Sequence, residues 1–247
     1  MERNELFKNY YKTCFGKAHP DLDRELKNVA INYSKFYKPF LPDDKEAKIL
    51  DIGCGLGHFL FALKEIGYKN FEGIDLAPDN VEIVKEKITE RAFLEDTFEY
   101  LPKKKNFYDF IHTRDIIEHI PKNKIIEFLK LIFQALKPGG KLIVGTANAA
   151  GFSSAVLIER YIDFTHEILF TEWSLEQVLK IVGFQEIEII SSELKFKDKS
   201  LKGKIGYILF RKPAYLLKRL YLYLAGRQPL PKILHWHMIA IAKKPEK

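Results

Sequence analysis

A glycine-rich segment at residues 50–57, LDIGCGLG, carries the clearest chemical signal in the sequence. Its glycines, Gly53, Gly55 and Gly57, follow residues 48–52, a short apolar run that predicts a strand, and they precede a predicted helix. Glycines let the backbone turn sharply and approach a ligand closely, and the first turn of a helix presents free N–H groups. The segment therefore predicts a nucleotide-like cofactor at the carboxyl end of a sheet strand.

Two further features bear on which cofactor this is. A dinucleotide-binding fingerprint spaced G-x-G-x-x-G would place its third glycine at position 58, which is His58. Asp75 ends the next predicted strand, residues 71–76, and a carboxylate there can accept hydrogen bonds from both hydroxyls of a ribose. NAD-binding folds use a carboxylate in the same way, and a solvated strand-end Asp is the structural alternative. Asp75 alone therefore does not identify the cofactor.

The run LDIGCGLG resembles motif I of the class I (Rossmann-like) S-adenosylmethionine-dependent methyltransferases. Three later segments follow in the order of that family: Glu95-Asp96-Thr97, residues 107–119 (FYDFIHTRDIIEH) and residues 136–142 (LKPGGKL). The resemblance covers residues 48–145. It implies methyltransferase activity with S-adenosylmethionine as the cofactor.

The resemblance also implies a set of cofactor-binding residues: Asp51, Gly53, Cys54, Gly55, Gly57, Asp75, Leu76, Asp96, Thr97, Arg114 and Asp115. Asp51 and Gly53 are expected near the ammonium of the methionine part, and Asp96 near the adenine amino group. Arg114 or Asp115 is expected near the methyl end. Arg114 departs from the family pattern, which often has a small or amide residue there. Because its charge would repel a sulfonium, Arg114 is expected to point toward an anionic acceptor instead.

Methyl transfer from a sulfonium is a single displacement, so alignment matters most and no metal is expected. A hydroxyl acceptor benefits from a general base, and His166 is the preferred candidate. It lies in residues 160–171, after the fifth predicted strand, where Asp163 could orient its imidazole. His119 is a second candidate. Each histidine has a structural alternative, a hydrogen bond to a backbone carbonyl.

Residues 163–175, DFTHEILFTEWSL, are similar to a subgroup of these methyltransferases that modify sugars and cell-envelope polysaccharides. This similarity makes a sugar or saccharide hydroxyl the leading acceptor, with a quinone-type phenol or another small hydroxylated metabolite as the alternative. A nucleic-acid methyltransferase is disfavoured, because Arg114-Asp115 stand where amino-methylating enzymes carry an Asn/Asp-Pro-Pro-aromatic signature. A non-catalytic cofactor-binding module is a further alternative.

Strand and helix patterns alternate over residues 48–145, which predicts βαβ units and a parallel, doubly wound sheet. The fold class expected is α/β, a three-layer αβα sandwich. Its seven-stranded sheet should be mostly parallel, with an antiparallel last strand over residues 237–242. Residues 1–46 predict a helical N-terminal cap, in which Asp21 or Asp23 begins a helix, and residues 47–247 the methyltransferase domain.

Positive charge is concentrated near the C-terminus. The chain has a net charge of +7, yet residues 195–247 hold 14 Lys/Arg and 2 Asp/Glu, whereas residues 1–194 hold 26 and 31. Within an insertion at residues 195–236, residues 213–225 predict a helix that is apolar nearly all round. Its surface must therefore be buried in the domain, in a partner or in a lipid interface. An anionic membrane surface is expected. A lid over the site, a solvated basic face and a homodimer contact are the alternatives.

The composition fits a globular protein, with 47% hydrophobic and 30% charged residues. No run reaches the roughly 20 uninterrupted apolar residues that span a bilayer, and the first residues show no secretory signal. The two cysteines, Cys14 and Cys54, suit a reducing compartment. A cytoplasmic location is therefore expected, with peripheral contact at the inner face of the membrane.

Overall fold

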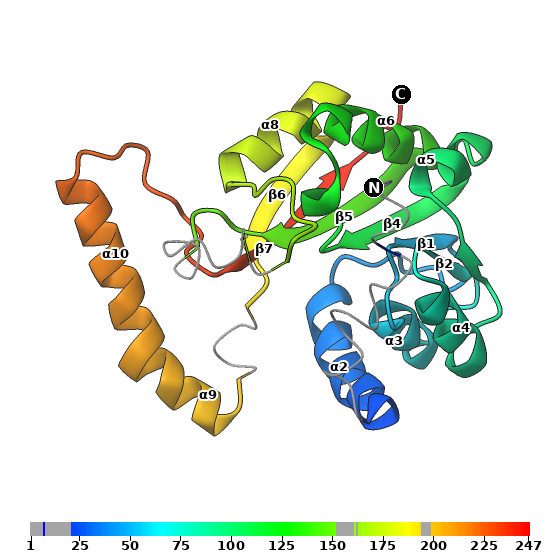
Figure 1. The fold of residues 1–247 in the computed structure, drawn as a ribbon, viewed down its shortest axis with the longest axis horizontal. Coiled ribbons are helices and arrows are strands. Elements are labelled where there is room, and N and C mark those ends of the chain that lie inside the picture. Colours follow the sequence, from blue (N-terminus) through cyan, green and yellow to red (C-terminus); the bar gives the residue numbers. More distant parts are fainter. Residues whose placement is uncertain (1–6, 8–20, 152–160, 162, 194–198) are drawn as a thin grey trace.

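The computed structural model describes residues 7, 21–151, 161, 163–193 and 199–247 of the chain. These residues form one seven-stranded sheet in the order β3-β2-β1-β4-β5-β7-β6 (Figure 1). Its strands are β1 (Ile49–Ile52), β2 (Phe71–Asp75), β3 (Ala92–Leu94), β4 (Tyr108–Arg114), β5 (Leu136–Ala147), β6 (Gln185–Ser191) and β7 (His237–Lys243). Only β7 runs antiparallel to its neighbours, β5 and β6. The predicted fold class is confirmed.

Helices cover both faces of the sheet and make the three layers (Figure 1). The helices of one face are α2 (Leu22–Tyr37), α3 (His58–Ile66) and α4 (Pro78–Lys87), and those of the other are α5 (Thr97–Tyr100), α6 (Ile125–Ala135) and α8 (Glu172–Val182). Successive strand residues serve opposite faces: in β1, Ile49 packs with α3, while Leu50 and Ile52 pack with the α6 side. All four residues of β1 are buried, as expected for a strand covered on both sides.

The strand register brings four strand ends together. Ile52 of β1 pairs with Ile74 of β2 and with Thr113 of β4, and Arg114 pairs with Gly145 of β5. Because these strands are parallel, the loops that follow them emerge at one edge of the sheet. That edge is where open α/β sheets bind ligands.

Two element boundaries differ from those that the sequence pattern predicts, which are a helix over residues 122–136, a stop at Pro138-Gly139-Gly140 and a strand over residues 141–145. In the structure α6 ends at Ala135 and β5 begins at Leu136, so Pro138-Gly139-Gly140 belongs to a strand and not to a loop. The reason is long-range: Gly139 N–H donates to the carbonyl of Lys244, and Lys244 N–H donates to that of Gly140. The C-terminal end of the chain thus keeps this segment extended.

The N-terminal helix begins where its capping residue predicts. Asp21 caps α2 by accepting a hydrogen bond from the N–H of Arg24 at 3.2 Å. The helix packs on α3, with the Tyr37 ring edge-on to Phe59 and Glu25 bonded to His58. Residues 1–6 and 8–20 of the predicted cap lie outside the described residues, and its division from residues 47–247 stays a prediction.

A helical arm extends from the sheet domain, in orange in Figure 1. It consists of α9 (Leu201–Gly206), a π-helical turn (Tyr207–Arg211) and α10 (Lys212–Leu224). The Nζ of Lys218 holds it by donating to the carbonyls of Ala150 and Gly151. Among the described residues, no helix is long and apolar enough to cross a membrane.

Candidate active site

A cavity of about 510 Å³ opens where β1, β2, β4 and β5 end. This volume is typical of cofactor and small-ligand sites. Most of the predicted site residues line it: Asp51, Gly53, Cys54, Gly55, Asp75, Leu76, Thr97, Arg114, Asp115, His119, Asp163 and His166. Tertiary folding thus joins the predicted cofactor loop and the predicted catalytic segment in one space.

Gly57 and Asp96 do not line this cavity. Gly57 has a left-handed backbone (φ 79°) at the start of α3, and a Cβ there would overlap the side chains of Ile88 and Val84. Asp96 caps α5 by accepting from the N–H of Phe98 at 2.8 Å. In the structure both residues shape the loops, while Glu95 and Thr97 face the cavity beside Asp96.

The glycine loop is tied to the end of β2. The N–H groups of Gly53 and Cys54 both donate to the carbonyl of Ile74, at 2.8 and 3.0 Å. The N–H of Gly55 donates to Asp75 Oδ2 at 2.8 Å, and Gly55 itself is left-handed (φ 52°). Glycine is needed because other residues strain in this conformation.

Hydrogen bonds hold the Asp75 carboxylate beside the glycine loop. Its Oδ1 accepts from the N–H of Ala77 at 2.8 Å and from Asn80 Nδ2 at 3.2 Å. Burial raises the pKa of Asp75, although the hydrogen bonds from Ala77 and Gly55 oppose the shift. A carboxylate offers about four acceptor positions, so Asp75 keeps capacity for a ligand hydroxyl. Asn80 was not predicted, because its place at the start of α4 carries no local signal.

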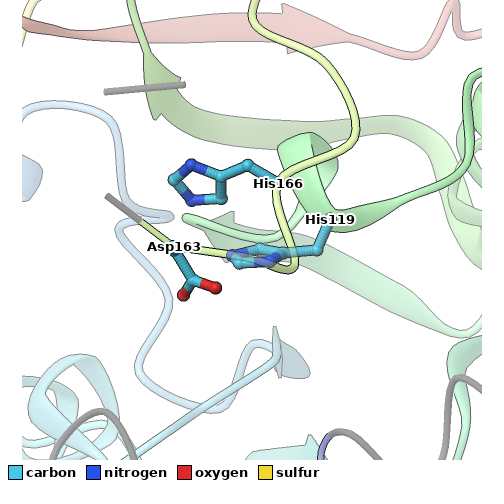
Figure 2. Close-up of side chains that lie close together, drawn as sticks. All are labelled: His119, Asp163 and His166. Carbon is cyan, nitrogen blue, oxygen red and sulfur yellow. The ribbon is translucent and has the colours of Figure 1, made fainter. Parts of the chain in front are cut away.

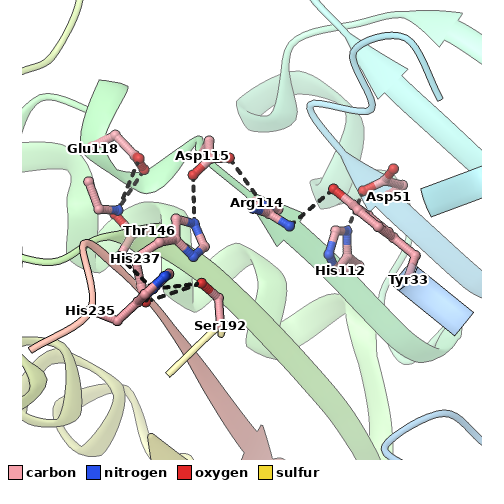
Figure 3. Close-up of polar contacts among 11 residues, drawn as sticks. Tyr33, Asp51, His112, Arg114, Asp115, Glu118, Thr146, Ser192, His235 and His237 are labelled. Carbon is pink, nitrogen blue, oxygen red and sulfur yellow. Dashed lines mark hydrogen bonds and ion pairs between the residues drawn. The ribbon is translucent and has the colours of Figure 1, made fainter. Parts of the chain in front are cut away.

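Asp51 pairs with His112, which was not among the predicted site residues. His112 Nδ1 lies 2.7 Å from Asp51 Oδ1, and both side chains are buried (Figure 3). The imidazole stacks on the Phe59 ring with 3.9 Å between centroids. Within the described part of the chain, His112 Nε2 has no hydrogen-bond partner although the residue lines the cavity. A histidine directly after the apolar Phe110 and Ile111, inside the segment 107–119, was the available signal.

Arg114, the last residue of β4, and Asp115, which follows it, form a charged network (Figure 3). Arg114 donates from Nε to Asp115 Oδ2 at 3.2 Å and from Nη1 to Tyr33 Oη at 3.1 Å. Asp115 Oδ1 also lies 2.7 Å from Nε2 of His237, which is fully buried. Burial alone would raise the pKa of Asp115, but His237 and Arg114 together hold it well below its usual value. Arg114 thus has a counter-ion within the protein, Asp115. The prediction that Arg114 points toward an anionic acceptor did not anticipate this pair.

Glu118 lines the same cavity but is 1% exposed. Its Oε2 lies 3.0 Å from Thr146 Oγ1, and its Oε1 accepts from the N–H of Ala147 at 3.4 Å. Burial raises the pKa of Glu118, and the Asp115 carboxylate raises it further. Glu118 was not among the predicted site residues, although its position between Asp115 and His119 in the segment 107–119 is a signal in the sequence.

His119, Asp163 and His166 gather at one end of the cavity (Figure 2). His119 Nδ1 lies 2.7 Å from Thr165 Oγ1, and this hydroxyl lies 2.7 Å from Asp163 Oδ1. If the hydroxyl donates to the carboxylate, it accepts from Nδ1–H and leaves the lone pair of His119 on Nε2. Asp163 therefore orients His119 through Thr165, and its expected role in orienting His166 stays a prediction. The rings of His119 and His166 lie 4.7 Å apart.

The His119 imidazole is neutral near pH 7. Burial lowers its pKa to about 4, and the neighbouring His166 contributes in the same direction. A neutral imidazole can accept a proton or bind a metal ion, which a protonated one cannot. The site therefore offers an unprotonated nitrogen to a ligand.

Aromatic side chains from distant segments complete the cavity: Phe7, Tyr33 and Trp236. The Phe7 ring lies edge-on to His119, 6.0 Å away. None of the three was predicted, because they come from the N-terminal segment, α2 and the end of the insertion. No local pattern links these regions.

A family model described as a methyltransferase domain matches residues 24–189. The chain is 29% identical over 197 residues to the ubiquinone biosynthesis O-methyltransferase of Rickettsia akari, covering 77% of this chain and 74% of that protein. It is 27% identical over 165 residues to the tRNA U34 carboxymethyltransferase of Idiomarina loihiensis, covering 62% of this chain but only 50% of that one.

A solved structure has a similar fold. Phosphoethanolamine N-methyltransferase 2 of Haemonchus contortus, in complex with S-adenosyl-L-methionine, superimposes with a TM-score of 0.63 and 20% identity. The match covers 99% of this chain and 60% of that one. At this identity the likeness concerns the fold.

Replacing Glu118 by Gln should weaken the pH dependence of stability. Because the folded-state pKa of Glu118 is raised above the unfolded value of about 4.3, its stabilising effect is complete below that value and is lost as pH rises through the folded-state pKa. Gln cannot ionise, so the free energy of unfolding of Glu118→Gln should fall less between about pH 5 and about pH 9. Urea unfolding at several pH values measures this. Glu127→Gln, at an exposed position of α6, is the control, and equal slopes for Glu118→Gln and wild type would contradict the assignment.

Proposed function

The chain belongs to the methyltransferase-domain family, and on that premise we propose that it O-methylates an aromatic, quinone-type hydroxyl acceptor. The methyl donor is S-adenosylmethionine. One observation carries the proposal: the glycine loop with Asp75 and the histidine pair at residues 119 and 166 line the same cavity. Donor and acceptor can therefore meet in line for a direct displacement.

The cofactor fits the polar groups at the loop end of the cavity. We assign Asp75 to the ribose hydroxyls, because its carboxylate is already oriented by backbone N–H groups. The buried pair of Asp51 and His112 is assigned to the methionine part, where His112 Nε2 offers a polar atom. Thr97 lies beside Asp96 in the segment expected near the adenine.

The aromatic lining favours an aromatic acceptor. Phe7, Tyr33 and Trp236 offer faces and edges against which a planar ring packs well. The Rickettsia akari relative, which is named as a ubiquinone biosynthesis O-methyltransferase, supports the same class. The saccharide acceptor rests on the resemblance of residues 163–175 alone, and we place it second.

The histidine end of the cavity suits a hydroxyl acceptor. In the displacement the acceptor oxygen bonds to the methyl carbon while the carbon–sulfur bond breaks, and the hydroxyl proton must leave. His119 is neutral and oriented through Thr165, and His166 lies beside it. These residues are therefore assigned to activation of the hydroxyl.

Asp75→Ala should weaken binding of S-adenosylmethionine by about 1 to 3 kcal/mol, because hydrogen bonds to a charged group are lost. Calorimetry measures the affinity for S-adenosylmethionine, its demethylated product and NAD. Glu82→Ala, at an exposed position of α4, is the matched control and should leave the affinity unchanged. Unchanged affinity in Asp75→Ala, or tight NAD binding without a response to S-adenosylmethionine, would remove the assignment.

His166→Ala should lower turnover by about 100-fold while leaving cofactor affinity nearly intact, as expected for a group used only in the chemical step. The assay uses labelled S-adenosylmethionine with a panel of quinol-type phenols, saccharides and RNA. Methylated phenol is the expected product. A parallel loss of turnover and thermal stability would show that His166 is structural, and a methylated saccharide or RNA would replace the proposed acceptor class.

We also propose that the arm binds anionic lipid surfaces. Its inward residues, Ala214, Lys218 and Leu222, are spaced four apart and half-buried, whereas the outward side chains of Leu217, Tyr221 and Leu224 are 67%, 70% and 73% exposed. Residues 199–236 contain nine Lys/Arg and no Asp/Glu. An outward apolar face with only basic charges around it complements an anionic bilayer, and it would bring the cavity close to a lipid-dissolved acceptor.

Vesicles containing anionic lipid should co-sediment the protein at low salt, and salt should weaken the association because the charges are screened over about 8 Å at physiological ionic strength. Leu216→Asp and Leu220→Asp should abolish sedimentation without changing stability, because both side chains are exposed. Leu222→Asp, on the inward face, is the contrast. If Leu216→Asp and Leu220→Asp instead dissociate a dimer in sedimentation velocity, or if wild type fails to bind vesicles, the outward face of α10 contacts a partner or a second copy of the chain.

A further inference from the structure

The acceptor end of the cavity contains a set of metal-ligand groups, one from each of His119, Asp163 and His166. Their candidate ligand atoms all lie within 4.8 Å of one another (Figure 2). His119 ends the short helical turn after β4 and is buried, whereas Asp163 and His166 come from the segment before α8 and are half-buried. Two segments separated in sequence thus converge their imidazoles and carboxylate on one point.

The donor set has a defined chemical preference. Two imidazole nitrogens and one carboxylate oxygen suit first-row divalent transition metals, as in zinc sites with two histidines and a glutamate. Mg²⁺ and Ca²⁺ prefer oxygen ligands only. Tetrahedral zinc with bonds of about 2.0 to 2.2 Å holds its ligand atoms ~3.4 Å apart. Side-chain rotations that move the ligand atoms by about 1 Å would therefore bring these three residues to bonding distance of one ion.

The surroundings of His119 match those of a metal ligand. Metal-binding histidines commonly donate their second ring N–H to a neighbouring group, which fixes the tautomer. Here His119 Nδ1 lies against Thr165 Oγ1, and Thr165 is bonded to Asp163 through both its hydroxyl and its N–H. This relay orients two of the three ligands at once.

We propose that His119, Asp163 and His166 bind one divalent transition-metal ion beside the acceptor, and that this site prefers Zn²⁺. Three protein ligands leave coordination positions open, as in catalytic zinc sites. In its catalytic role, which rests on the proposed function, the ion would bind the acceptor oxygen and ease loss of its proton to water. The oxygen then bonds to the methyl carbon, and both electrons of the broken carbon–sulfur bond remain on sulfur. The residues assigned to hydroxyl activation would act through the ion.

Titration of the chelator-treated, full-length protein with Zn²⁺ tests binding without any acceptor. One ion per chain is expected, with no comparable binding of Mg²⁺. Substitution by Co²⁺ should give visible absorption bands typical of low coordination number. His119→Ala, His166→Ala and Asp163→Asn should each weaken Zn²⁺ binding by more than about 100-fold, since even outer residues change metal affinity by 10- to 100-fold.

Thr165 supplies the matched pair of variants. Thr165→Val removes the relay and should weaken Zn²⁺ binding by about 10- to 100-fold, whereas Thr165→Ser keeps the hydroxyl and should restore it. His58→Gln, whose imidazole bonds to Glu25 instead, should not change Zn²⁺ affinity. Affinity for S-adenosylmethionine reports that each variant is folded.

Absence of Zn²⁺ binding, equal binding of Mg²⁺, or unchanged Zn²⁺ affinity in the folded ligand variants would overturn the proposal. Turnover of the metal-free protein equal to that of the zinc-loaded protein would overturn the catalytic role of the ion. A panel of acceptors without any methylated product would instead overturn the proposed function and leave the metal site standing.

Discussion

The link between the glycine loop and the end of β2 is the constraint on which the cofactor end of the site depends. Three consecutive N–H groups, at residues 53–55, donate to Ile74 and Asp75. Gly53 and Gly55 adopt left-handed backbone conformations in this loop, and both residues line the cavity. The same bonds orient the Asp75 carboxylate. Loop shape and ligand recognition therefore have one physical cause.

The opposite end depends on groups brought in from much later in the chain. Asp115 adopts a positive φ of 56° directly after β4, and it is held by Arg114 on one side and by His237 of β7 on the other. Through Arg114 the network reaches Tyr33 of α2. The N-terminal helix, the central strand and the last strand are thereby tied to one charged group at the cavity wall.

Burial and neighbouring groups together decide the protonation states at this wall. The desolvated Glu118 favours its neutral form, whereas Asp115, whose side chain is half exposed, stays ionised because His237 and Arg114 lower its pKa. His119 remains neutral for the same desolvation reason. One small region thus contains a neutral acid, an ionised acid and a neutral base, which is the range that proton-dependent chemistry needs.

The sequence by itself determined the fold class, the family and most of the cofactor loop. Those features are local: the alternation of strand and helix, the spacing of Gly53, Gly55 and Gly57, and the distance to Asp75 all fall within short windows. The acceptor subgroup inferred from residues 163–175 was not confirmed, because acceptor recognition depends on which side chains from other segments reach the cavity.

Tertiary structure alone decided the partners of the site residues. Asp115 bonds to His237, 122 residues later, and Asp51 bonds to His112, 61 residues later. The relay from Asp163 through Thr165 ends on His119, and most of the apolar side chains of α10 are exposed to solvent. Periodicity and spacing describe only near neighbours along the chain. Which distant side chains meet is set by strand order and register, and those are properties of the assembled sheet.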